Sequence, residues 1–183
     1  MVWTWIIIGV VVIVALMFFV YYNRFVRLIN QIDNSLAQID VQLRRRGELI
    51  PNLLESVKGY MKHEKGVITE VTNARKALVG AKDIGGRVKA GGQLQQALGH
   101  LFAIAENYPN LKANENFLQL QQELASTEDK IAYSRQYYND GVMSYNVVTT
   151  TLPGRWFAGL YGFKKKEYLQ IPVETRAVPK ISF

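Results

Sequence analysis

Histidine next to glutamate is the nearest approach in this sequence to a catalytic motif. His63-Glu64 matches the start of a zinc metalloprotease motif, but that motif places a second histidine four residues after the first, and position 67 is Val67. The only other histidine is His100, and the absence of cysteine removes thiolate ligands and thiol nucleophiles. No serine nucleophile context or cluster of acidic metal ligands is apparent. We therefore predict a non-enzymatic protein with no cofactor, metal site or small-molecule substrate.

Polar residues at apolar positions of predicted helices form the first set of candidates. Glu64, Glu128 and Arg135 each occupy such a position, and a buried carboxylate is costly unless it is paired, so each should meet a base or a helix amide. We interpret them as polar layers that set the register of a bundle; an interface between subunits and a ligand site are the alternatives. Asparagines in the set should make hydrogen bonds between helices. The candidates for this network or interface are Asp40, Gln42, Arg45, Arg46, Asn52, Glu64, Arg75, Asn116, Glu128, Arg135, Asn139, Tyr145 and Asn146.

Aromatic and basic residues alternate in a second set near the C-terminus, RWFAGLYGFKKKEY at residues 155–168. This composition suits contact with a membrane surface, and packing across a helical bundle is the alternative. The net charge of +7 favours anionic partners, but the chain has no nucleic-acid recognition motif, so we predict no nucleic-acid partner. Candidates for membrane-surface contact are Arg24, Arg27, Arg155, Trp156, Lys164, Lys165 and Lys166.

An uncharged run at residues 2–22 predicts a membrane anchor. Its 21 residues make a helix of about 31 Å, which matches the ~30 Å hydrocarbon core of a bilayer. Tryptophans near its start and tyrosines at its end suit the two membrane–water interfaces. No signal-peptide cleavage site follows the run. All charged residues lie from Arg24 onward. Arg24 and Arg27 therefore predict an outer N-terminus and a cytoplasmic bundle.

The elements that would position these candidates are amphipathic helices. Apolar residues recur at steps of three and four from position 25 to 78, which predicts either one long helix or two helices broken at Pro51. The five glycines within Gly80–Gly92 predict a loop, and they lack the lysine and preceding strand of a phosphate-binding loop. A helix over 94–108 should follow, and then another from the N-cap Asn114 to position 152. Pro172 and Pro179 indicate an extended tail.

No such helix can bury its apolar face alone, so the faces must pack together. The predicted fold is all-α: an N-terminal transmembrane helix, an elongated antiparallel up-and-down bundle of three to four long helices, and an extended C-terminal tail. The corresponding domains are a transmembrane anchor at residues 1–23, an α-helical bundle at 24–152 and a basic, aromatic tail at 153–183.

Two long blocks carry a family resemblance: QIDVQLRRRGELIPNLLESVKGYMKHE at residues 38–64 and LKANENFLQLQQELASTEDKIAYSRQYYNDGVMSYN at 111–146. Together with EVTNAR at 70–75, they resemble the LemA family over nearly the whole chain. The resemblance implies a bacterial inner-membrane protein with a single span, a helical bundle and no established enzymatic activity. A related protein takes part in forming magnetosome membranes, which suggests a role in membrane organisation by analogy.

These observations favour a membrane-anchored scaffold that assembles with itself, with lipid or with another membrane protein. Because the span contains only Gly9 and Ala15 as small residues, self-association should run through the helices outside the membrane. The predicted partners are the lipid bilayer, further copies of the chain and another membrane protein. The alternative function is an adaptor or sensor that binds another membrane or cytoplasmic protein through the bundle.

Overall fold

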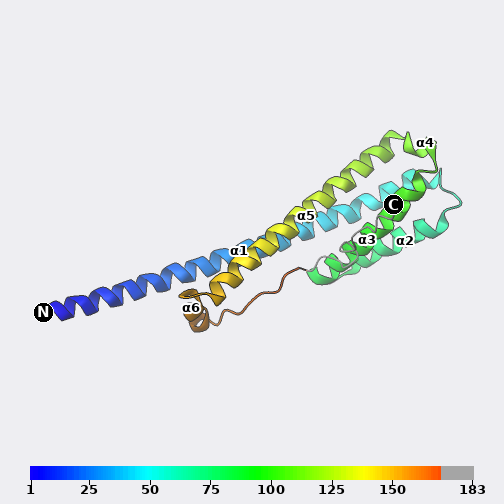
Figure 1. Ribbon diagram of the computed structural model, residues 1–183. Helices are drawn as coiled ribbons and strands as arrows, with labels where there is room; N and C mark the ends of the chain where they lie inside the picture. Colours follow the sequence, from blue (N-terminus) through cyan, green and yellow to red (C-terminus); the bar gives the residue numbers. More distant parts are fainter. Residues whose placement is uncertain (170–183) are drawn as a thin grey trace, which may run out of the picture. The chain divides into compact units, whose positions relative to one another are not determined.

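The computed structural model describes residues 1–169, which form six helices and no strand (Figure 1). The predicted all-α class, with an apolar N-terminal helix and a helical bundle, is confirmed. Pro172 and Pro179 of the predicted tail lie outside the described residues. The helices are α1 Val2–Lys58, α2 Lys65–Gly80, α3 Ile84–Ala105, α4 Pro109–Lys112, α5 Glu115–Thr150 and α6 Gly154–Tyr161.

The chain divides into two compact parts, and α1 and α5 contribute to both. The anchor part comprises residues 1–35 and 135–169, and the bundle part comprises residues 36–134. The start of α1 is long and apolar enough to cross a membrane, and none of that stretch is buried within the protein. It is a candidate membrane span, as the uncharged run predicts.

Helix α1 continues through Pro51 and ends at Lys58, so neither form of the prediction for residues 25–78 is right. A proline lacks the amide hydrogen that would bond the carbonyl of residue 47, four positions earlier. In the structure Arg75 Nε donates to that Gly47 carbonyl at 2.8 Å. The acceptor left free by Pro51 is therefore satisfied by a side chain from α2, and the break falls after Lys58, where Gly59 follows.

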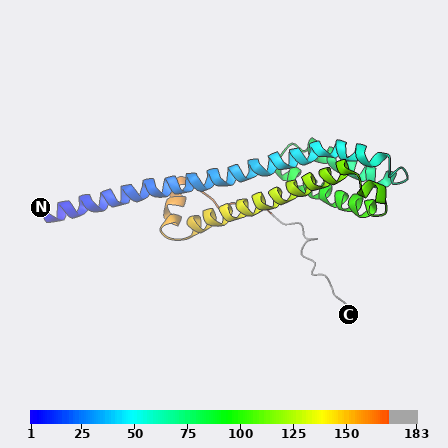
Figure 2. The same cartoon turned by 90° about the horizontal axis from the view of Figure 1, so that it is seen from above.

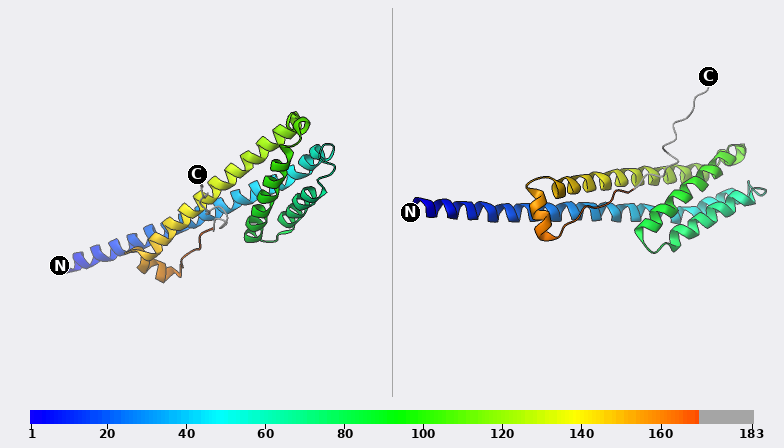
Figure 3. Two further views of the ribbon diagram at one scale, coloured as in Figure 1. Left: turned by 45° about the vertical axis from the view of Figure 1, so that its right-hand side comes forward. Right: turned by 60° about the horizontal axis from the view of Figure 1, so that its bottom comes forward.

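Four helical segments enclose the core of the bundle part: residues 36–58 of α1, α2, α3 and residues 115–134 of α5. Helices α2 and α3 lie side by side and run in opposite directions (Figure 3). The short α4 connects α3 to α5, and the Asn114 side chain caps α5 by accepting a hydrogen bond from the Phe117 amide at 3.1 Å. The buried apolar side chains include Ile39, Leu43, Ile50, Leu53, Val57, Val71, Leu78, Leu94, Leu101, Phe117, Leu124 and Ile131.

The glycine-rich segment predicted as a loop is helical from Ile84 onward, so that prediction is wrong. Asp83 caps this helix by accepting a hydrogen bond from the Gly86 amide at 2.8 Å. Gly91 is buried against α1, and a Cβ atom there would lie 2.5 Å from a methyl group of Leu43. Burial of one face outweighs the low helix propensity of glycine, and the missing side chain permits close packing on α1.

The anchor part consists of the start of α1, the end of α5, α6 and a final segment without regular secondary structure at residues 163–169. Figure 2 shows the end of α5 running beside α1, with α6 close to both. The rings of Phe25 and Tyr145 meet edge to face, 5.8 Å apart, and join α1 to α5.

Residues 154–161 form a helix, so the prediction of an extended chain is wrong there. This helix ends in a Schellman motif. Gly162 adopts φ 74°, in the left-handed region that favours glycine, and the Phe163 amide donates to the Ala158 carbonyl at 2.9 Å. The motif closes the helix and turns the chain into the segment at 163–169.

Gly154 and Gly159 offer a matched test of how α6 is seated. A Cβ atom at buried Gly154 would collide with the backbone carbonyl of Val148, whereas a Cβ atom at Gly159 would meet open space. We expect Gly154→Ala to lower the free energy of unfolding by about 1–3 kcal/mol because backbone must move. Gly159→Ala should raise it by up to about 1 kcal/mol through helix propensity. Denaturant unfolding of the full chain in detergent micelles measures both, and equal effects would contradict this packing.

Candidate functional site

The most deeply buried charge in the bundle part is the guanidinium group of Arg46, on α1, whose residue is 1% exposed. Its Nε donates to Thr127 Oγ1 and its Nη1 donates to Gln95 Oε1, both at 3.1 Å. Its Nη2 forms an ion pair with Glu128 Oε2 at 2.5 Å. The Thr127 hydroxyl in turn donates to the Leu124 carbonyl at 2.7 Å. One side chain thus joins α1 to α3 and α5.

Two of the Arg46 partners were not among the sequence candidates. Thr127 occupies an apolar position between Leu124 and Ile131, which is the same signal that singled out Glu128. Gln95 directly follows buried Leu94, and no pattern in the sequence distinguishes it from its polar neighbours. A buried guanidinium needs several acceptors at once, and only the packed helices reveal which side chains supply them.

Asp40, also on α1, lies between two arginines. It accepts a hydrogen bond from Arg44 at 3.0 Å and forms an ion pair with Arg87 of α3. Partial burial acts to raise the pKa of Asp40, but the hydrogen bonds and charges of Arg87 and Arg44 outweigh it and hold the pKa below its usual value. Asp40 therefore stays ionised at neutral pH and serves as a second polar link between α1 and α3.

The remaining candidates of the bundle part are more scattered. Glu64 is half-buried and accepts a hydrogen bond from the Tyr108 hydroxyl at 3.0 Å, which raises the pKa of Tyr108. Within residues 1–169 it forms no ion pair with a base. Arg75 bonds the Gly47 carbonyl, as described above. Arg45 lies 3.9 Å from Glu123 at the surface. Gln42 is half-buried, and Asn52 and Asn116 are exposed. Arg135, which belongs to the anchor part, is half-buried.

A shallow cavity of about 280 Å³ lies between α3 and α5, next to the Arg46 partners. Its lining is mainly apolar, with Glu128 and Asp129 contributing carboxylates, and it contains no histidine, serine or threonine. His63 is exposed, and His100 lies on the surface 3.1 Å from Glu70. Among residues 1–169 no group of three or more metal-ligating side chains lies close together.

Two asparagines of α5 hold residues 163–169, which we call the strap, in the anchor part. Asn146 accepts a hydrogen bond from the Lys166 amide and donates one to the Lys166 carbonyl, both at 2.9 Å. Asn139 likewise accepts a hydrogen bond from the Leu169 amide at 3.0 Å and donates one to the Leu169 carbonyl at 3.3 Å. The Tyr138 hydroxyl donates to the Glu167 carbonyl at 3.1 Å. These asparagines therefore bind extended backbone and not a second helix, contrary to the prediction.

The spacing of the two asparagines matches that of the strap residues they bind. Seven residues of helix, from 139 to 146, advance about 10 Å at ~1.5 Å per residue. Three extended residues, from Lys166 to Leu169, cover about the same distance at ~3.3 Å per residue. The strap consequently runs antiparallel to α5, and an amide side chain with one donor and one acceptor fits each backbone site.

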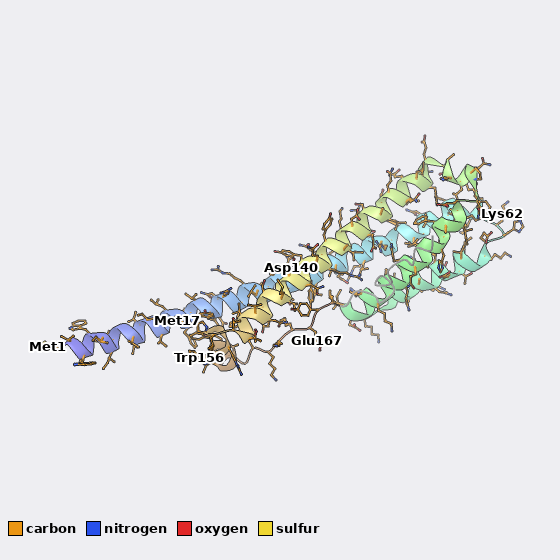
Figure 4. The ribbon with its side chains drawn as sticks, in the orientation of Figure 1. Met1, Met17, Lys62, Asp140, Trp156 and Glu167 are labelled. Atoms are coloured by element: carbon orange, nitrogen blue, oxygen red, sulfur yellow. The ribbon has the colours of Figure 1, made fainter. Side chains whose placement is uncertain are left out.

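The candidates for membrane-surface contact all belong to the anchor part, at its first and last segments. Trp156 of α6 and Glu167 of the strap are labelled in Figure 4. Lys166 is half-buried, with its Nζ 5.9 Å from the centre of the Tyr145 ring, and burial raises the pKa of Tyr145. The exposed members are Arg24, Arg27, Arg155, Trp156, Lys164 and Lys165.

We predict that the asparagine pair protects the strap from proteolysis. Replacing Asn139 and Asn146 by alanine removes four hydrogen bonds to the strap backbone, so trypsin should cleave after Lys164 and Lys165 faster than in the native chain. Asn116→Ala, at an exposed asparagine of the same helix, is the control. Unchanged cleavage in the double variant would show that these hydrogen bonds do not hold the strap.

Comparison with known proteins places the chain in a family. The family model of the LemA family matches residues 35–183. Magnetosome protein MamQ 1 of Paramagnetospirillum magneticum is 27% identical over 175 residues, which cover 81% of this chain and 64% of that protein. Protein LemA of Metamycoplasma hominis is 28% identical over 137 residues, covering 73% and 63%. The chain thus spans somewhat under two thirds of the length of these relatives. On the match over residues 35–183, the chain belongs to the LemA family.

Proposed function

We propose that this chain is a non-enzymatic scaffold that is anchored in the membrane by α1 and assembles with copies of itself along α5. Three features support the proposal. The start of α1 is suited to span a bilayer. The polar candidates with described contacts bond other parts of the same chain. Finally, one face of α5 exposes several large apolar side chains, although the helix is part of a packed structure.

The exposed face of α5 is the observation that carries the proposal. Tyr137, Met143 and Val147 are each about half exposed, and Tyr133 one turn earlier is more exposed still. At 100° per residue these four side chains fall within about 120° of the helix circumference. We call them the α5 stripe. Large apolar side chains gathered on one exposed face are typical of an interaction surface.

A second copy of the chain is the partner that best suits the α5 stripe. Copies anchored in one membrane share an orientation, and confinement to a surface raises their effective concentration. A two-fold axis along the membrane normal would bring the α5 stripe of one copy against the same stripe of another. Arg24 and Arg27 after the span support a cytoplasmic location for this contact.

Membrane organisation is the role that we infer for such an assembly. Relatives in Paramagnetospirillum magneticum and Magnetospirillum gryphiswaldense are named magnetosome proteins, and this supports the inference by analogy. The second candidate function is an adaptor for another membrane or cytoplasmic protein. The cavity between α3 and α5, with an apolar lining and carboxylates from Glu128 and Asp129, favours this alternative.

Engineered cysteines test self-assembly directly because the native chain has none. Single cysteines at Asp140 and Ser144 would lie near the centre of the α5 stripe, and one at Tyr137 would lie at its edge. In membranes under mild oxidation we expect a disulfide-linked dimer from at least one of them, since a disulfide requires Cβ atoms within about 4.5 Å. Lys76→Cys, at an exposed position of α2, should give none.

Assembly along α5 would be contradicted if none of the three stripe cysteines gave a crosslinked dimer, or if Lys76→Cys gave an equal yield of dimer. A single chain per nanodisc by mass would then favour the adaptor. The same variants also report orientation: labelling of Asp140→Cys in intact cells by a membrane-impermeant maleimide would contradict a cytoplasmic bundle.

A further inference from the structure

Helix α6 has two different faces, and one of them packs on the candidate membrane span. Phe157 stacks on Tyr21 with ring centres 4.9 Å apart, and the Tyr161 ring meets Phe18 edge to face at 4.8 Å. The Tyr161 hydroxyl donates to the Phe18 carbonyl at 2.7 Å. These contacts fix α6 against the last turn of the apolar run.

A second face of α6, about 100° around the helix from the first, carries large apolar side chains that contact little of the protein. Trp156 is 67% exposed and Leu160 is 73% exposed. They are four residues apart and so share one face, as do Phe157 and Tyr161 on the side toward α1. Helix α6 is therefore apolar on two faces. One of them packs on α1, and the other has no partner among the described residues.

The depth of α6 follows from where its contacts lie on α1. The apolar run ends at Tyr22, and Phe18 precedes that end by four residues, or about 6 Å of helix. If residues 2–22 cross the bilayer, Phe18 and Tyr21 lie at the boundary between acyl chains and headgroups. A helix bonded to them lies at the same level, with Trp156 and Leu160 facing lipid.

Charge around α6 is positive and exposed. Arg155 lies in the first turn of the helix, Lys164 and Lys165 follow it, and Arg24 and Arg27 come after the span. Glu167 is the one acidic residue among positions 152–169. Exposed basic residues beside a membrane-embedded apolar face complement anionic headgroups.

We propose that α6 is an interfacial helix that inserts Trp156 and Leu160 into the leaflet at the C-terminal end of the span and holds anionic lipid headgroups with Arg155, Lys164 and Lys165. The hydrogen bond from Tyr161 to Phe18 sets the depth of insertion. This inference rests on the anchoring of the chain by α1 and is independent of self-assembly along α5.

Tryptophan fluorescence of the full chain tests the insertion. Replacing Trp3 and Trp5 by tyrosine leaves Trp156 as the only tryptophan. The chain is reconstituted in phosphatidylcholine vesicles, with or without phosphatidylglycerol, whose acyl chains are brominated near the headgroup. We expect a blue-shifted Trp156 emission that loses most of its intensity to bromine, with a greater loss when phosphatidylglycerol is present. Lys164→Gln with Lys165→Gln should abolish that difference.

The control carries its single tryptophan on α5, as Tyr137→Trp with Trp156→Phe, and should not be quenched. Three results would overturn the proposal: a water-like Trp156 emission, a blue-shifted emission that bromine does not quench because a second copy covers the residue, or equal quenching of the control. Cysteine crosslinking in the same vesicles reports self-assembly separately. Failure of α6 insertion is therefore distinguishable from failure of the scaffold.

Discussion

The bundle part depends on one constraint: a guanidinium group is held away from water between three helices. Burial removes the hydration of Arg46, so its donors need acceptors in defined directions. Gln95 of α3 and Thr127 and Glu128 of α5 supply them. Apolar contacts elsewhere in the core tolerate sliding, whereas this set of bonds forms in only one register. Two of the polar candidates of the sequence, Arg46 and Glu128, therefore join helices.

The same principle governs the anchor part, where polar side chains bond the backbone. Asn139 and Asn146 hold the strap along α5, and Tyr161 holds α6 on the Phe18 carbonyl. In each case a side chain satisfies a backbone group that lies outside regular secondary structure or at a helix surface. These bonds fix which surfaces remain available: the exposed face of α5 and the outer face of α6 carry the proposed contacts with other copies and with lipid.

Much of the fold could be predicted because apolar spacing and caps act locally. The uncharged run and the N-cap Asn114 are examples. The helical start of α3 could not be predicted from the sequence, because the close packing of Gly91 on Leu43 is a tertiary effect that outweighs helix propensity. The sequence does contain a signal for the end of helix α6, namely a glycine at position 162 after an apolar segment. Among the candidate sites, charge pairing predicted a base or a helix amide as the partner of Glu128. It did not predict Gln95 as a partner of Arg46, because sequence pattern does not specify partners across helices.

A double-mutant cycle at Arg46 and Glu128 tests the central claim most directly. Unfolding of the full chain in detergent would be measured for Arg46→Met, Glu128→Gln and the double variant. If the ion pair fixes the bundle, the two changes are coupled by about 1–2 kcal/mol. The same substitutions at Arg45 and Glu123, which are 3.9 Å apart at the surface, should be nearly additive. Additivity at Arg46 and Glu128 to within about 0.5 kcal/mol would contradict the account.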